Sequence, residues 1–151
     1  MDPVAIAEQI NALQKQTFAG DLGIVVVSAT RDSVTATLEV RPGHRQPQGI
    51  VHGGVYATFI ESVASIGAAL DAMPQGKNVV GLENHTSFVR AVREGTLHAV
   101  ATPVTRGRRS QLWDVVIRND EQAVAATGRV RLLVLDPEAQ VAGTELSLKS
   151  E

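Results

Sequence analysis

The chain of 151 residues contains no cysteine and few aromatic residues. The absence of cysteine excludes disulfide bonds, thiolate metal ligands and a cysteine nucleophile. Aromatic residues make up only 3% of the chain, so its core has to be built from valine, alanine, leucine and isoleucine. Neither sign of charge dominates, because 14 basic and 16 acidic residues give a net charge of -2. This balance argues against non-specific nucleic-acid binding.

The sequence also lacks a long uninterrupted hydrophobic run. Residues Met1, Asp2 and Pro3 do not show the basic and apolar regions of a signal peptide. The apolar stretch 50–70 is interrupted by a histidine, glycines and an acid, which argues against a membrane span. We therefore expect a cytoplasmic protein with no membrane partner, and the chain length is typical of one domain.

The periodicity of the apolar residues predicts a short helix, two strands, one long helix and four further strands. Asp2 and Pro3, followed by apolar residues at helical spacing, indicate the first helix over residues 2–19. Residues 23–28 are β-branched and residues 33–40 alternate strictly, which is typical of a hairpin. Turn residues separate the later strand-like runs 78–89, 96–105, 110–118 and 123–135.

This order of elements predicts an α+β fold, in which an antiparallel sheet wraps around one long central helix. The predicted domain covers residues 1–151, with its core at about 23–135 and a loose tail at 136–151. Pro103 falls inside a predicted strand, which indicates an edge position or a bulge. Sheet surface that the helix leaves open is expected to be covered by a partner subunit.

The predicted long helix, residues 52–72, carries one acid in an apolar setting. Glu61 is the only charged residue between Gly53 and Leu70. A helix that is apolar nearly all round is usually buried, and an ionised carboxylate is costly there unless it is paired or hydrogen-bonded. Glu61 is therefore either a functional acid or a buried acid that Ser65, the backbone or a wet subunit seam satisfies.

The residues that surround this helix start match a known family. The segment from Gln46 to Gly54, followed by Glu61 to Ser65, resembles the hotdog-fold acyl-CoA thioesterases with a catalytic glutamate on the central helix. That branch includes the Arthrobacter-type 4-hydroxybenzoyl-CoA thioesterase, the 1,4-dihydroxy-2-naphthoyl-CoA thioesterase and the enterobactin proofreading thioesterase. Further matches lie at residues 80–90, at Arg93-Glu94-Gly95 and at Trp113-Asp114-Val115, so the resemblance covers about residues 23–135.

The resemblance implies the hotdog fold and hydrolysis of an acyl-CoA thioester to a free acid and coenzyme A. It implies Glu61 as the nucleophile or general base, and the Gly53 N–H as the group that polarises the thioester carbonyl. Gln46 and His52 are implied at the thioester, and Ser65 near the catalytic water. No cofactor or metal ion is expected, because coenzyme A is part of the substrate.

The resemblance also suggests where the substrate lies and how subunits assemble. An aromatic acyl group, such as hydroxybenzoyl or 1,4-dihydroxy-2-naphthoyl, is implied by the branch. Dimers with shared active sites, paired into a homotetramer, are implied as the assembly. The segment 106–110 is more basic than in several relatives. Positions implied in substrate or CoA binding are Gly54, His85, Thr86, Ser87, Arg90, Arg106, Arg108, Arg109 and Ser110.

The chemistry at the helix start is consistent with this resemblance. The first N–H groups of a helix are unpaired and carry the positive end of its dipole, so Gly53 and Gly54 suit an oxyanion. Gly53 and Glu61 are eight residues apart, roughly 12 Å along one helix. Because one carbonyl cannot reach both, we expect Gly53 of one subunit to act with Glu61 of another.

Several alternatives remain open at this stage. His52 is either a helix cap or a chemical group, Ser65 either bonds its own helix or serves the site, and Trp113 is either core or a substrate platform. The arginines at 106–109 form either a solvated turn or a phosphate site. The alternatives to an acyl-CoA thioesterase are a broad-specificity or carrier-protein proofreading thioesterase and a non-catalytic acyl-CoA-binding module. A dehydratase is disfavoured, because no His–Asp pairing stands at the helix entry.

Overall fold

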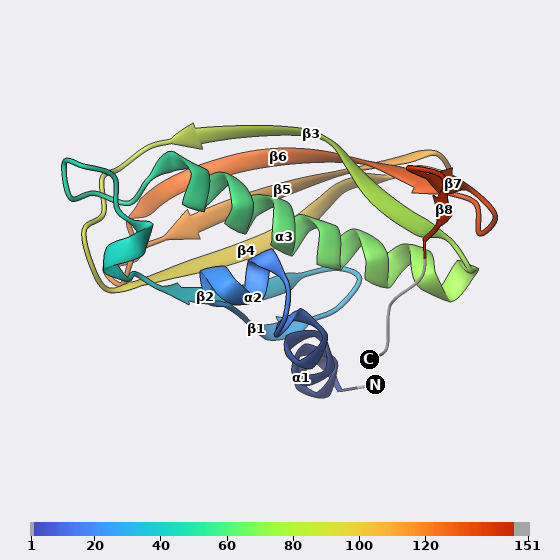
Figure 1. Cartoon of the computed structure of the whole chain (residues 1–151), viewed down its shortest axis with the longest axis horizontal. Coiled ribbons are helices and arrows are strands. Elements are labelled where there is room, and N and C mark those ends of the chain that lie inside the picture. The colour runs from blue at the N-terminus through green and yellow to red at the C-terminus, as the bar shows by residue number, and fades with distance from the viewer. Residues whose placement is uncertain (1, 147–151) are drawn as a thin grey trace.

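A six-stranded antiparallel sheet curves around one long helix in the computed structural model, which describes residues 2–146 (Figure 1). Helix α3 (Gly53–Ala72) runs across the concave face of the sheet. The strands lie in the order β1-β2-β4-β5-β6-β3. Their bounds are β1 Ile24–Ala29, β2 Val34–Glu39, β3 Asn78–Phe88, β4 Thr96–Arg106, β5 Ser110–Arg118 and β6 Val124–Leu135. The predicted α+β fold is confirmed, and the predicted strands and long helix agree closely with these bounds.

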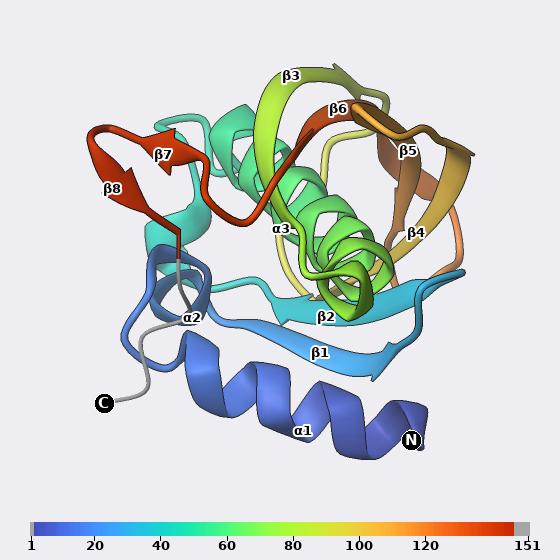
Figure 2. The same cartoon turned by 90° about the vertical axis from the view of Figure 1, so that its right-hand side faces the viewer.

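Alternation of side chains gives the sheet one buried face. In β2, Val34, Ala36 and Leu38 are buried, while Thr35 and Thr37 between them are half-buried. Strand β5 repeats this pattern in its odd-numbered residues. The buried face packs against α3, and Figure 2, turned so that α3 runs in depth, shows the sheet wrapped around the helix. Strand periodicity in the sequence therefore predicts which face of the sheet receives the helix.

Glycines allow the helix and the sheet to approach closely. A Cβ at Gly67 of α3 would collide with the ring of Trp113, which is fully buried. In β6, a Cβ at Gly128 would lie 2.7 Å from Cγ2 of Ile60. Trp113 is therefore a core residue, which resolves the alternative that the sequence left open. At Pro103 the β4–β5 register shifts, so the predicted bulge is confirmed.

Both ends of the chain differ from the simple elements expected there. The helix predicted over residues 2–19 is two helices, α1 (Pro3–Gln14) and α2 (Phe18–Leu22), because Thr17 acts as the N-cap of a new helix. The segment after β6 was expected to lack regular structure, yet β7 (Gln140–Val141) and β8 (Thr144–Glu145) form a short hairpin. Residues 147–151 lie outside the described part of the chain.

Short 3-10 turns flank the long helix, η1 (Pro42–His44) before it and η2 (Met73–Gln75) after it. The helical segment Gly53–Gln75 is long and apolar enough to cross a membrane by length and composition alone. It contacts all six strands of the sheet, and 44% of its most apolar window is buried within the fold. Core helices of soluble proteins meet the same two criteria.

The two edges of the sheet differ in whether another element covers them. At the β1 edge, the Asn11 side chain of α1 donates to the carbonyl of Val26 (2.8 Å) and accepts from its N–H (2.9 Å). Asn11 thus takes the place of a neighbouring strand. At the other edge, β3 pairs only with β6 among residues 2–146. Most of its 11 residues are exposed, including Leu82 and Phe88. An uncovered edge strand of this length is a template for pairing with another chain.

Replacing Asn11 by Ala should lower the free energy of unfolding by about 1–3 kcal/mol, because two backbone groups of Val26 lose their partner. Urea denaturation measures this difference. Gln9→Ala is the matched control, since Gln9 is an exposed residue of the same helix. An equal loss of stability in the two variants would show that the Asn11 amide does not protect the β1 edge.

Candidate active site

The N-terminus of α3 presents a free backbone N–H at Gly53. His52 is the N-cap, and its Nδ1 accepts a hydrogen bond from the N–H of Gly54 (2.8 Å). The N–H of Val55 bonds to the carbonyl of His52 (2.9 Å). Among residues 2–146, the N–H of Gly53 has no acceptor. The two predicted glycines therefore differ, because Gly53 offers a donor at the positive end of the helix dipole and Gly54 does not.

The capping contact also defines the state of the His52 ring. An imidazole that accepts at Nδ1 is neutral and carries its proton on Nε2. His52 is an exposed residue, so Nε2–H can donate to a ligand or to water. The structure thus shows the capping role of His52, and its predicted contact with a thioester stays a prediction.

A cavity of about 290 Å³ lies beside Gly53. We call it the Gly53 cavity, and its walls are formed by Gln46, Ile50, Val51, Gly53, Tyr56, Phe88, Val89, Arg90 and Ala91. The ring of Phe88 covers Gly53 so closely that a Cβ there would lie 2.6 Å from Cζ of the ring. The rings of Tyr56 and Phe88 are tilted, with their centroids 6.2 Å apart. The free N–H therefore borders a cavity with two aromatic walls.

Tyr56 is a neutral part of this wall. Its side chain is buried, and its hydroxyl has no hydrogen-bond partner among the described residues. Burial raises the pKa of Tyr56 to about 12, so the phenol stays protonated at neutral pH.

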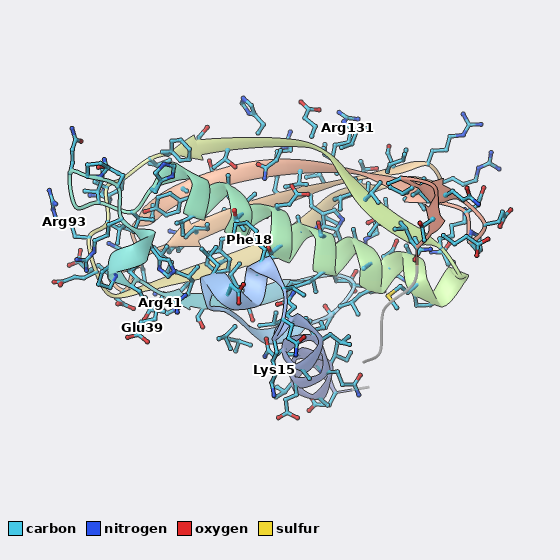
Figure 3. The ribbon with its side chains drawn as sticks, viewed as in Figure 1. Lys15, Phe18, Glu39, Arg41, Arg93 and Arg131 are labelled. Atoms are coloured by element: carbon cyan, nitrogen blue, oxygen red, sulfur yellow. The ribbon has the colours of Figure 1, made fainter. Side chains whose placement is uncertain are left out.

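The loop before α3 presents Gln46 to the cavity. It closes through hydrogen bonds from Gln46 N–H to the carbonyl of Ile50 (2.9 Å) and from Gly49 N–H to the carbonyl of Gln46 (2.8 Å). Gly49 has a φ of 79°, which favours glycine at this turn. The Arg93 guanidinium, labelled beside this loop in Figure 3, donates to the carbonyl of Gln48 (3.0 Å). These contacts hold the loop against the segment that follows β3.

The buried side chain and backbone of His44 also support this loop. The carbonyl of His44 accepts from the N–H of His52 (2.8 Å), and its Nδ1 accepts from the N–H of Arg41 (3.0 Å). Burial, aided by the Arg41 charge, lowers the pKa of His44. His44 therefore stays neutral near pH 7, which suits a ring nitrogen that accepts a hydrogen bond.

Glu61 lies roughly two helical turns from Gly53 and contacts β3 instead of the cavity. It is half-buried, and its Oε2 accepts from Nδ2 of Asn84 (3.2 Å). Ser65 follows one turn later on the same face. The Ser65 hydroxyl forms no hydrogen bond within residues 2–146, whereas Ser62 bonds the helix carbonyl of Thr58 (2.8 Å). Within one chain, Gly53 and Glu61 do not meet.

The residues predicted on β3 point to two different places. His85 and Ser87 border an outer-face hollow of about 320 Å³ that also contains Asp114 and Arg129. The guanidinium of Arg129 donates twice to the Asp114 carboxylate, at 2.6 and 2.7 Å. Thr86 instead faces the helix side and donates to Asn84. The structure therefore does not bring His85 and Ser87 to the Gly53 cavity, whereas Arg90 lines that cavity.

The basic turn between β4 and β5 lies near the C-terminal end of α3 (Figure 1). Arg106 forms ion pairs with Asp32 and with the buried Asp71 (3.6 Å), and it lies over the Trp113 ring at 5.9 Å. Gln111 donates to Asp71 (3.0 Å) and accepts from Trp113 Nε1 (2.9 Å). Arg106 thus has partners within its own chain, which compete with its predicted contact to CoA.

The other basic residues of this turn have a different setting. Arg108 and Arg109 are exposed, and Ser110 begins β5. No ion pair of either arginine occurs within residues 2–146, so both can meet phosphates. Among the same residues, no group of three His, Cys, Asp or Glu side chains could hold a metal ion.

The sequence alone assigns no role to Asn84, Phe88 or Tyr56. The register of β3 shifts between Gly81 and Glu83, so simple alternation does not show that Asn84 contacts the helix. Tyr56 could have been found, because it lies three residues after Gly53 and therefore on a neighbouring part of the same helix face.

Removing the Arg106 charge should destabilise the fold, because Asp71 is only 8% exposed and loses one of its cationic partners. For Arg106→Gln we expect the free energy of unfolding to fall by about 1–3 kcal/mol, measured by chemical denaturation. Arg108→Gln, at an exposed position of the same turn, should leave it unchanged. Equal stability of the two variants would contradict a structural role for Arg106.

Comparison with known sequences places the chain in a family. The family model of the Thioesterase superfamily matches residues 48–126. A candidate esterase of Mycobacterium tuberculosis is 44% identical over 121 residues, covering 79% of this chain and 86% of that protein. A proofreading thioesterase of Cronobacter sakazakii is 34% identical over 128 residues, covering 85% of this chain and 93% of that protein.

Solved structures support the same assignment. The crystal structure of a thioesterase from Haemophilus influenzae matches with a TM-score of 0.81 at 34% identity, covering 86% of this chain and 90% of that one. The structure of the Mycobacterium tuberculosis protein matches with a TM-score of 0.78 at 43% identity, covering 81% of this chain and 98% of that one. The chain has the hotdog fold and belongs to the thioesterase superfamily.

Proposed function

We propose that the chain hydrolyses an acyl-CoA thioester, with Glu61 as nucleophile or general base and the Gly53 N–H polarising the thioester carbonyl. The observation that carries this proposal is the free N–H of Gly53 at the wall of an aromatic-lined cavity. A backbone donor at a helix N-terminus stabilises the oxyanion that forms when a thioester carbonyl is attacked. Membership of the thioesterase superfamily supports the reaction class.

The reaction follows one of two courses at this site. As a general base, Glu61 takes a proton from water, whose oxygen attacks the carbonyl carbon. As a nucleophile, Glu61 attacks the carbon itself, and water then hydrolyses the resulting mixed anhydride. In both courses the C–S bond breaks, the CoA thiolate leaves and takes up a proton, and the acyl group departs as the acid. The Gly53 N–H serves the oxyanion in either course.

A shared site between two subunits follows from the distance between Gly53 and Glu61. The uncovered edge of β3 offers the contact, because two such strands can pair antiparallel about a two-fold axis. An axis near His85 sets Phe88, which covers Gly53, opposite Leu82 of the second chain. Leu82 adjoins the Gly81 position against which Glu61 lies. One pairing therefore brings each Gly53 cavity towards the Glu61 of the other chain, and a tetramer stays a further prediction.

The acyl group that fits best is compact and aromatic. The chain has only three phenylalanines, one tyrosine and one tryptophan, and two of these, Tyr56 and Phe88, line the Gly53 cavity. Tilted aromatic rings attract a further ring in edge or offset stacking. Arg90 at the same cavity supplies positive charge for CoA phosphates, and the exposed Arg108 and Arg109, at the other end of α3, can add to it only from another subunit. A CoA ester as substrate is in keeping with the proposed cytoplasmic location.

A thioester on a carrier protein is the second candidate substrate. The observation that favours it is the 34% identity to a proofreading thioesterase. The two substrates differ in what lies beyond the pantetheine arm, a nucleotide or a folded protein. Measuring kcat/KM for one acyl group on CoA and on a carrier protein distinguishes the two substrates. Replacing Arg108 and Arg109 should lower kcat/KM more for the CoA ester than for the carrier-protein ester.

Thiol release from a panel of acyl-CoAs tests the proposed reaction. Wild type should hydrolyse aromatic acyl-CoAs, and Glu61→Gln should lower kcat by about a hundredfold or more, because an amide neither attacks nor accepts the proton. Glu39→Gln, at an exposed acid of β2, is the matched control and should keep wild-type activity. Binding of acyl-CoA without turnover by wild type would favour the non-catalytic module instead.

Phe88→Leu should lower kcat/KM for an aromatic acyl-CoA by about tenfold, because a stacking wall of the cavity is lost. For an aliphatic acyl-CoA of similar size, the change should be within about twofold, since leucine keeps the apolar contact. Val100→Leu, at an exposed position of β4 outside this cavity, serves as the control. Equal losses for both substrates would count against an aromatic acyl group.

A further inference from the structure

Asn84 connects β3 to the catalytic face of α3. Its Nδ2 donates to the helix carbonyl of Ala57 (2.9 Å) and to Oε2 of Glu61 (3.2 Å). Its Oδ1 accepts from the hydroxyl of Thr86 (2.6 Å). Both ends of the amide therefore have partners, one of which is the only acid on this stretch of the helix.

The partners determine which way the Asn84 amide points. The carbonyl of Ala57 can only accept, so the NH2 group has to face it. The second hydrogen of the same NH2 is then available for Oε2 of Glu61. The hydroxyl of Thr86 completes the arrangement by donating to Oδ1, which opposes a flip of the amide. Asn84 is thus oriented as a donor towards the Glu61 carboxylate.

Gly81 provides the space that the other oxygen of Glu61 occupies. A Cβ at this position would collide with Oε1 of Glu61. The register of β3 shifts directly after Gly81, so the strand bends where the carboxylate lies. Oε1 has no hydrogen bond within residues 2–146, whereas Oε2 is held by Asn84. The two oxygens of Glu61 are therefore unequal.

We propose that Asn84 is a positioning residue for Glu61, which holds Oε2 and leaves Oε1 as the oxygen that attacks the thioester or accepts the water proton. The inference rests on the proposed function and adds to it a specific role for β3. Fixing one oxygen restricts rotation of the carboxylate, so the lone pairs of Oε1 keep one direction. The absence of a side chain at Gly81 leaves space for Oε1 in this orientation.

A purely structural role for Asn84 predicts a different outcome. In that case its hydrogen bond to Ala57 merely joins β3 to α3, and Glu61 is incidental. Asn78 offers a matched control on the same strand, because its Nδ2 donates to the carbonyl of Leu146 (3.3 Å). Asn78→Asp removes a strand contact of the same kind without touching Glu61.

The kinetic test compares Asn84→Asp and Asn78→Asp. Asn84→Asp sets a second carboxylate against Oε2, and repulsion should turn Glu61 out of position. We expect kcat to fall by about tenfold or more with KM changed by less than about twofold. Asn78→Asp should alter neither constant. If the two variants lose stability equally and keep wild-type kcat, Asn84 is only a structural contact.

A spectroscopic test does not depend on activity. The side-chain amide signals of Asn84, assigned in the NMR spectrum by their loss in Asn84→Asp, should shift in Glu61→Gln and stay in place in Glu39→Gln. Unchanged Asn84 signals in Glu61→Gln would overturn the inference even for an active enzyme. Shifted signals in a protein that hydrolyses no thioester would reject the proposed function and retain the Asn84–Glu61 contact.

Discussion

Close packing of α3 against the concave face of the sheet is the constraint on which the rest of the structure depends. With few aromatic side chains, the core reaches its density by letting backbones approach, at Gly67 against Trp113 and at Gly128 against Ile60. Any side chain at these glycines would push the helix outwards. The helix is therefore fixed in height and rotation above the strands, and so are the groups that it carries towards β3.

The candidate site results from where this fixed helix meets the edge strand. Its N-terminus lies under Phe88 at the end of β3, and Glu61 lies against Gly81 further back along the same strand. Strand β3 is also the edge that no other element of the described chain covers. The Phe88 wall of the Gly53 cavity, the contact of Glu61 and the uncovered edge of the sheet therefore all lie on β3. In the proposed dimer, a second copy pairs with this edge about a two-fold axis and thereby completes two sites.

Much of the fold could be predicted because its signals are local. Strict alternation predicted β2, turn residues delimited the later strands, a long apolar run with one acid predicted α3, and the glycine pair marked the helix start. The prediction of one N-terminal helix was wrong in part, because Thr17 caps a second helix that apolar spacing alone does not reveal. Contacts between distant residues could not be predicted. Arg106 finds Asp71 only after the sheet has formed.

In the candidate site, too, local signals could be predicted and contacts between distant residues could not. Gly53 and Glu61 were recognisable from residue type and position on the helix. Asn84 was not, because the register shift in β3 after Gly81 changes which side chains face the helix. Phe88 and Tyr56 become neighbours only through the fold, and the cavity that they line has no counterpart in the linear sequence.

The central claim is that Gly53 of one chain acts with Glu61 of another. Mixed dimers test it most directly, each built from one Gly53→Ala chain and one Glu61→Gln chain carrying different tags and purified through both. Each variant alone should be inactive, because Glu61→Gln removes the acid and the Cβ of Gly53→Ala would collide with the Phe88 ring that borders the N–H. The mixed dimer should recover about half of the wild-type kcat, because one of its two sites has both groups intact. Mixed dimers as inactive as the two parents would contradict a site shared between subunits.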